Sequence, residues 1–141
     1  RYEDRWVQLK PNPDSPCIFT KGLAVHGVLP MPVRHGEGKL VARDAATLQR
    51  LQDENLIALQ YTHPETGEAT QEHPWNPNGS PLAIAGLTDP TGHILGLMPH
   101  PDAFHHATNH PGWTRGEVAV PGTALFANAV RYLRENPVNH S

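Results

Sequence analysis

Short segments that are apolar, or that alternate between apolar and polar residues, recur along the chain and predict a protein rich in β-strands. We expect strands at residues 2–9, 28–33, 56–61, 82–87 and 94–98. The second segment contains Pro30 and Pro32, which lack an N–H for strand pairing, so it should lie at a sheet edge or strand margin. The apolar run from Ile94 to Met98 predicts a buried strand.

Turn residues and helical periodicity predict the connections and two helices. The turn signal at residues 89–92 joins the last two strands, which predicts an antiparallel hairpin. A helix is expected over 44–53, with Asp44 as its N-cap. A second is expected over 122–134, because five apolar residues fall on one face, namely Leu125, Phe126, Ala129, Val130 and Leu133.

These elements make a mixed α/β chain with only two helices. The sheet of an α/β domain needs helices on both faces to be covered. We therefore expect part of the helical layer to lie outside these residues. The chain starts with Arg1 rather than Met, which suggests a fragment of a longer polypeptide or a product of cleavage.

Composition narrows the classes of function. The chain has 141 residues, enough for one domain with a core, and a net charge of −3, which offers no basic surface for nucleic acid or an anionic membrane. No apolar run approaches the ~20 residues of a membrane span. The single cysteine, Cys17, excludes an internal disulfide and is typical of a reducing compartment.

The candidate chemistry is centred on His100, which has a proline on each side. Pro101 biases His100 toward extended geometry, and in an extended segment residues i and i+2 point to the same side. We therefore expect the imidazole of His100 and the carboxylate of Asp102 to lie side by side. A base oriented by a carboxylate is two thirds of a nucleophile–base–acid triad, although a structural hydrogen bond would need the same pair.

Two further segments carry candidate function. In residues 34–38 two glycines flank a glutamate, which suggests close approach to a ligand, or else a plain tight turn. Several histidines follow His100 and raise the hypothesis of a metal site. Zinc sites usually use four well-spaced ligands, often with cysteine, so exposed loop histidines are the preferred interpretation of His105, His106 and His110.

Four sequence blocks together resemble a known family. They are VRHGEG at 33–38, NPNGS at 76–80, IAGL at 84–87 and GLMPHPD at 96–102. In order and spacing they resemble the glutaminase domain of phosphoribosylformylglycinamidine synthase, a class I glutamine amidotransferase. The resemblance implies a flavodoxin-like fold of which residues 1–141 form the C-terminal portion, the half with the nucleophile lying upstream.

The same resemblance implies a function and partners. The domain would hydrolyse glutamine in a cytoplasmic step of purine biosynthesis and pass ammonia to a synthetase, either a separate subunit or a fused domain. The synthetase would use ATP and Mg, and the glutaminase domain itself would need no cofactor. The competing hypotheses are a non-catalytic domain that only binds a synthetase partner and, third, a histidine-loop metal binder.

The resemblance also assigns residues. His100 matches the catalytic histidine and Asp102 the acid that orients it, a position where the family usually has glutamate. His35, Gly36 and Glu37 match the segment that lines the glutamine pocket, largely through backbone groups.

Cys17 does not match the family's nucleophile. Its neighbours are Ser15, Pro16, Ile18 and Phe19, with no glycine to permit a strained elbow. We therefore expect Cys17 to be a small buried hydrophobe, and the 141 residues alone to have no glutaminase activity.

Overall fold

The computed structural model describes residues 3–36, 38–104, 106, 109, 111 and 121–137, and within them it contains one five-stranded sheet and two α-helices. The strand order is β2-β1-β3-β4-β5, and every neighbouring pair is antiparallel. The strands are β1 (Glu3–Pro11), β2 (Leu29–His35), β3 (Ile57–Thr62), β4 (Ile84–Thr88) and β5 (Leu95–Leu97). The mixed α/β class and all five predicted strands are confirmed.

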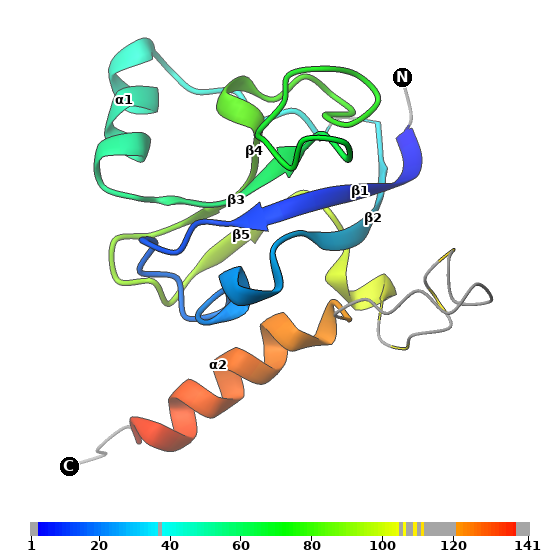
Figure 1. Ribbon diagram of the computed structural model, residues 1–141. Helices are drawn as coiled ribbons and strands as arrows, with labels where there is room; N and C mark the ends of the chain where they lie inside the picture. Colours follow the sequence, from blue (N-terminus) through cyan, green and yellow to red (C-terminus); the bar gives the residue numbers. More distant parts are fainter. Residues whose placement is uncertain are drawn as a thin grey trace.

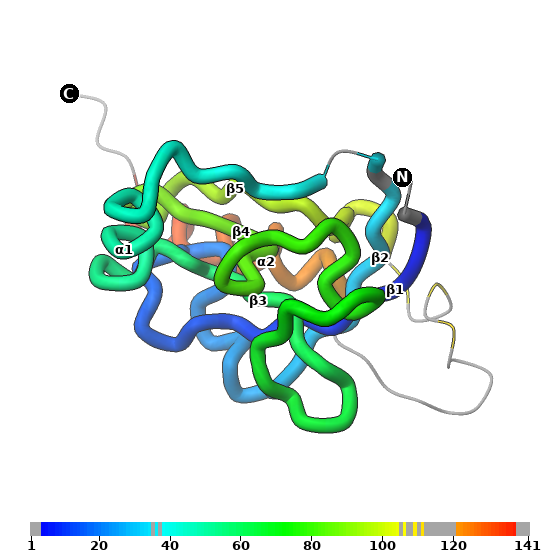
Figure 2. The backbone as a smooth tube through the Cα atoms, turned by 90° about the horizontal axis from the view of Figure 1, so that it is seen from above, coloured from blue at the N-terminus to red at the C-terminus, as the bar shows by residue number. Residues whose placement is uncertain are grey.

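The two α-helices lie on opposite sides of this sheet (Figure 1). They are α1 (Ala45–Asp53) and α2 (Thr123–Glu135), and both agree with the predicted positions. Asp44 caps α1 as expected, since its carboxylate accepts a hydrogen bond from the N–H of Thr47 at 2.8 Å. Viewed from above, α2 passes behind the sheet and α1 lies at one end of it (Figure 2).

The edge position of β2 is also confirmed. Among the described strands β2 pairs only with β1, and Pro30 and Pro32 stand opposite Gln8 and Trp6. The carbonyl of Pro32 points away from β1, because it accepts a hydrogen bond from the N–H of His100 at 2.8 Å. In an antiparallel strand the N–H and C=O of one residue point the same way, so the missing N–H of Pro32 removes no bond from the sheet.

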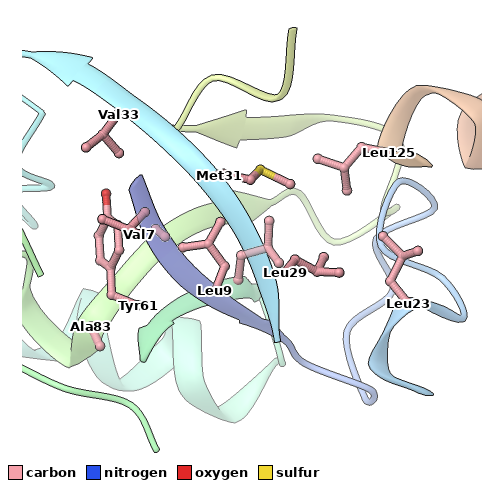
Figure 3. Close-up of a cluster of buried hydrophobic side chains, with 11 residues drawn as sticks. Val7, Leu9, Leu23, Leu29, Met31, Val33, Tyr61, Ala83 and Leu125 are labelled. Carbon is pink, nitrogen blue, oxygen red and sulfur yellow. The ribbon is translucent and has the colours of Figure 1, made fainter. Parts of the chain in front are cut away.

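The main core lies on one face of β1 and β2 and extends to α2 (Figure 3). Val7 and Leu9 alternate with less buried neighbours along β1, which is the period expected of a strand with one covered face. In β2 the alternation ends at Pro32, which is buried like Met31 and Val33. The buried members of this cluster are Val7, Leu9, Leu23, Leu29, Met31, Val33, Leu59, Tyr61, Ala83, Ala85 and Leu125.

Two burial predictions were wrong. β5 is not a buried strand: it is three residues long at the sheet edge, with Leu95 and Leu97 half-buried and Ile94 66% exposed. The predicted apolar face of α2 is not the buried one either. Leu125 is buried, but Phe126, Val130 and Leu133 are 48%, 49% and 54% exposed.

The reason in α2 is a polar contact that periodicity could not reveal. The Asn128 side chain is buried and donates hydrogen bonds to the carbonyls of Phe19 and Lys21, at 2.9 and 3.0 Å. These bonds turn the face that contains Leu125 and Asn128 toward the sheet. The large apolar residues on the other side of the helix are left facing outward.

Candidate active site

His100 lies just beyond β5, where the chain leaves the sheet. The N–H of Met98 donates to the carbonyl of Ala85 on β4, and the N–H of His100 donates to Pro32 on β2. The segment after β5 is thus held by two strands that are not sequence neighbours. Pro101–Ala103 then form η3, a short 3-10 helix for which His100 is the N-cap.

The local geometry at His100 differs from the prediction in one respect. His100 avoids the α region, with φ −109° and ψ 87°, as a residue before proline should. The extended geometry does not continue to Asp102, because the fixed φ of Pro101 also suits the first position of a helical turn. The N–H of Ala103 closes this turn on the carbonyl of His100 at 3.1 Å.

His100 and Asp102 nevertheless lie together. The distance from Nδ1 of His100 to Oδ1 of Asp102 is 3.7 Å, and their side chains are 43% and 73% exposed. This separation is longer than a hydrogen bond, and one water molecule or a small rotation of either side chain would bridge it. The predicted proximity is confirmed, and the catalytic role of the pair stays a prediction.

Packing at both ends of η3 fixes the position of His100. Phe104, directly after η3, is fully buried and meets the ring of Trp6 edge-on, with ring centroids 5.0 Å apart. On the other side, Gly122 at the start of α2 packs against Pro101 so closely that a Cβ would lie 2.6 Å from the Pro101 Cα. η3 is therefore clamped between β1 and α2.

A cavity of about 270 Å³ opens beside His100. His100 and Asp102 are the only titratable residues among its described lining residues, and the remaining walls are apolar. The other lining residues are Phe19, Leu95, Leu97, Pro99, Pro101, Leu125 and Phe126. This apolar lining is not predictable from local sequence patterns, because Phe19 lies in no periodic segment and the periodicity of α2 predicts Leu125 and Phe126 within a core face.

The segment at residues 34–38 is only partly described. Gly36 is exposed, whereas Glu37 and the side chain of His35 lie outside the described part of the structure. Arg34 pairs across the strands with Asp4, its Nε 3.8 Å from the Asp4 carboxylate, in an exposed pair that adds little stability. The hydrogen bond from His100 to Pro32 brings the end of β2 beside His100, but none of the described residues of 34–38 lines the cavity. A shared cleft stays a prediction.

Cys17 is a buried residue, as expected, with 1% exposure. It lies against the turn before β5, because the N–H of the next residue, Ile18, donates to the carbonyl of Gly92 at 3.0 Å. His100 follows the other end of β5. Cys17 therefore lacks both the exposure and the placement that a nucleophile paired with His100 would need.

The metal hypothesis gains no support from the part of the chain that is described. No group of three or more potential metal-ligating side chains occurs there. His106 is exposed, and His105 and His110 lie outside the described residues. A search of the same residues also finds no helix long and apolar enough to cross a membrane.

Comparisons with known proteins identify the family of this chain. Residues 1–133 match the family described as CobB/CobQ-like glutamine amidotransferase domain. Two similar curated proteins, both phosphoribosylformylglycinamidine synthase subunit PurQ, come from Methanococcus maripaludis strain C5 and Dehalococcoides mccartyi. They are 38% identical over 147 residues and 36% identical over 137 residues, and each match covers 96% of this chain.

The chain spans about half the length of these relatives, 53% and 50% respectively. A solved structure, that of PurLQS from Thermotoga maritima, is similar with a TM-score of 0.59 and 25% identity, over 94% of this chain and 49% of that one. The family match covers most of the chain and includes the segment around His100. The chain therefore belongs to the family of CobB/CobQ-like glutamine amidotransferase domains.

Proposed function

We propose that this chain is the portion of a glutaminase that supplies the histidine base and its acid partner. The glutaminase would serve phosphoribosylformylglycinamidine synthase, the enzyme named for the similar curated proteins. The observation that carries the proposal is the half-exposed His100, 3.7 Å from the Asp102 carboxylate and beside an open cavity, in a chain of the amidotransferase family.

In the proposed reaction a cysteine from outside these 141 residues attacks the carbon of the glutamine side-chain amide. His100 takes the thiol proton and delivers a proton to the departing ammonia, while Asp102 keeps the imidazole in the correct tautomer. Water, deprotonated by His100, then hydrolyses the thioester and releases glutamate. Residues 35–37 would line the glutamine pocket with backbone groups.

The proposal extends to partners and location. Ammonia would pass to a synthetase, as a separate subunit or a fused domain, that uses ATP and Mg to amidate a formylglycinamide ribotide. The glutaminase portion would need no cofactor of its own and would act in the cytoplasm. The competing function is a non-catalytic domain that binds a synthetase. The burial of Cys17 agrees with both functions, because neither uses Cys17 as a nucleophile.

Glutamate release from glutamine, by the protein at its full cellular length, tests the proposal. We expect His100→Ala to lower kcat by about 100-fold or more, since general acid–base groups contribute on the order of 10²–10⁴. Asp102→Asn should lower kcat less, and Asp102→Glu should retain most of the activity. The matched control is His26→Ala, which removes an exposed histidine of η1 (Leu23–His26), on a segment remote from η3 in sequence.

Loss of activity in His100→Ala but not in His26→Ala would support His100 as the base. Equal activity in the two variants would reject that role. The isolated 141-residue chain should release no glutamate, whether or not Cys17 is replaced by alanine. Turnover by the isolated chain that disappears in Cys17→Ala would identify Cys17 as the nucleophile and refute the proposed division of roles.

A further inference from the structure

The proposed mechanism does not use the buried polar loop at residues 70–80. Asn76, inside this loop, is 1% exposed, and its side-chain nitrogen donates to the carbonyls of Thr70 and Ser80 at 3.1 and 2.9 Å. Its side-chain oxygen accepts a hydrogen bond from the N–H of Ser80 at 2.9 Å. A buried amide is stable only when its polar atoms are hydrogen-bonded, and these bonds fix the position of Ser80.

Ser80 connects this loop to the segment that follows β2. The Ser80 side chain is buried, and its Oγ accepts a hydrogen bond from the N–H of Leu40 at 3.2 Å. Among the described residues, this is the one hydrogen bond that joins residues 38–42 to another part of the chain. The bond therefore anchors the chain directly after the glycine-containing segment at 34–38.

Both ends of that segment lie beside the residues that lead to the candidate base. Before it, the carbonyl of Pro32 on β2 accepts a hydrogen bond from the N–H of His100 at 2.8 Å. After it, Leu40 lines a cavity of about 120 Å³ together with residues of β4 and β5 and with Met98, which is two residues before His100. The chain between Pro32 and Leu40 therefore leaves the sheet and returns to it next to residues 98–100.

Of these two anchors, one is made by the backbone and one by a side chain. The bond from His100 to Pro32 joins main-chain atoms, whereas the bond from Leu40 requires the Ser80 hydroxyl. Loss of that oxygen would leave the Leu40 N–H without its partner and release one end of the segment. A segment held at one end samples more conformations, so a smaller fraction of molecules keeps the arrangement that binds a ligand.

We propose that Ser80, held in place by Asn76, is a positioning residue for glutamine binding. It fixes Leu40 and thereby keeps the backbone at Gly36 in the arrangement that receives glutamine. The inference rests on the proposed function, which assigns Gly36 to the glutamine pocket. Without the Ser80 hydroxyl, affinity would fall in proportion to the fraction of molecules that keep this arrangement, and bound glutamine would react at the same rate.

Steady-state glutamate release, by the protein at its full cellular length, tests this role. Ser80→Ala should raise KM for glutamine about fivefold, as expected for one typical hydrogen bond, and leave kcat within about twofold. Leu40→Ala weakens the packing of the same segment and should raise KM as well. The matched control is Ser15→Ala, because the Ser15 Oγ also accepts a backbone hydrogen bond, from Cys17 at 3.3 Å, in the loop after β1.

Two measurements separate positioning from loss of structure. Circular dichroism and thermal melting verify that each variant folds, and Leu40→Ala decides by the same criterion if Ser80→Ala does not. Hydrogen exchange of the Leu40 amide, followed by NMR, should accelerate roughly tenfold or more in Ser80→Ala and stay constant in Ser15→Ala. An unchanged exchange rate in Ser80→Ala would show that Ser80 does not anchor Leu40 and would overturn the inference.

Three kinetic outcomes would also overturn it. The first is an unchanged KM in both Ser80→Ala and Leu40→Ala. The second is a fall in kcat at unchanged KM, because the loop would then act on His100. The third is an equal rise of KM in Ser15→Ala, because the effect would then follow from a general loss of stability.

Glutamine binding separates this inference from the proposed function. Isothermal titration calorimetry in the His100→Ala background measures the Kd for glutamine without hydrolysis. If the parent protein released no glutamate but Ser80→Ala weakened binding in that background, the positioning role would stand and the glutaminase would be rejected. Glutamate release with a KM that neither Ser80→Ala nor Leu40→Ala changes would retain the glutaminase and reject the positioning role. Absence of glutamine binding would reject both.

Discussion

At each end of β5 a glycine packs against the backbone of a proline, yet the residue next to that proline is buried at one end and half-exposed at the other. Before the strand, Gly92 packs against Pro16, and the neighbouring Cys17 is 1% exposed. After it, Gly122 packs against Pro101, and the neighbouring His100 keeps 43% of its side chain exposed.

The contrast shows that tight packing of the backbone does not determine whether the neighbouring side chain is exposed. The backbone at Cys17 is held in place with its side chain turned inward, which suits a small core residue. The backbone at His100 is held by the hydrogen bond to Pro32 and by the packing of Gly122 against Pro101, and its side chain lies beside a cavity. A firmly placed and accessible side chain is what a catalytic base requires.

Among the substitutions that test this comparison, Gly92→Ala should lower the free energy of unfolding most. Gly92 has a φ of +78°, which strains an L-residue, and an added Cβ would overlap the carbonyl of Pro16. Backbone strain and overpacking together should lower the free energy of unfolding by roughly 3 kcal/mol or more. Urea denaturation measures the change, and a loss below 1 kcal/mol would show that the packing at this end is loose.

Gly122→Ala should cost less, because Gly122 has an ordinary φ of −59° and meets only the steric overlap with Pro101. We expect a loss of about 1–3 kcal/mol by urea denaturation, with NMR shifts concentrated in residues 99–104. If the shifts appeared mainly around Cys17 instead, the proposed clamp on η3 would be wrong.

Replacements of Cys17 should affect stability and leave catalysis unchanged. Cys17→Ala removes a buried sulfur and should cost about 1 kcal/mol. Cys17→Ser buries a hydroxyl in place of a thiol and should cost more, about 1–3 kcal/mol if that hydroxyl finds no partner. In the full-length protein both variants should retain kcat for glutamine, so a large loss in either would contradict the assignment of Cys17 to the core.

The smallest expected effect is the response of the turn before β5 to acid. The Thr91 hydroxyl, with the N–H groups of Ile94 and Thr91, donates to the Asp89 carboxylate and holds the pKa of Asp89 below its ordinary value of 3.8. Because the pKa is lower in the folded state, this carboxylate stabilises the turn above pH 3.8, and the contribution disappears as the pH falls through the folded pKa.

Hydrogen exchange of the Ile94 amide between pH 5 and pH 2.5, corrected for the intrinsic rate, measures this loss. The protection should fall with acid in the parent chain and vary less in Asp89→Asn. An identical pH dependence in the two proteins would exclude Asp89 as the cause.

The sequence by itself determined the elements and their neighbours along the chain. Alternation and turn residues located five strands, the cap at Asp44 marked the start of α1, and the prolines placed β2 at an edge. The proximity of His100 and Asp102 was also predictable, because two residues so close in sequence cannot separate far. These features depend on backbone geometry over a few residues, which the sequence encodes locally.

Tertiary structure alone decided which surfaces were covered. Periodicity identified the apolar residues of α2, but the bonds from Asn128 to the segment 19–21 selected the face that turns inward. The position of β5 at the end of the sheet exposed a strand whose composition suggested burial. Phe19 likewise joins the cavity at His100 from a distant part of the chain. Burial depends on contacts between segments that are distant in sequence, and local sequence patterns do not encode those contacts.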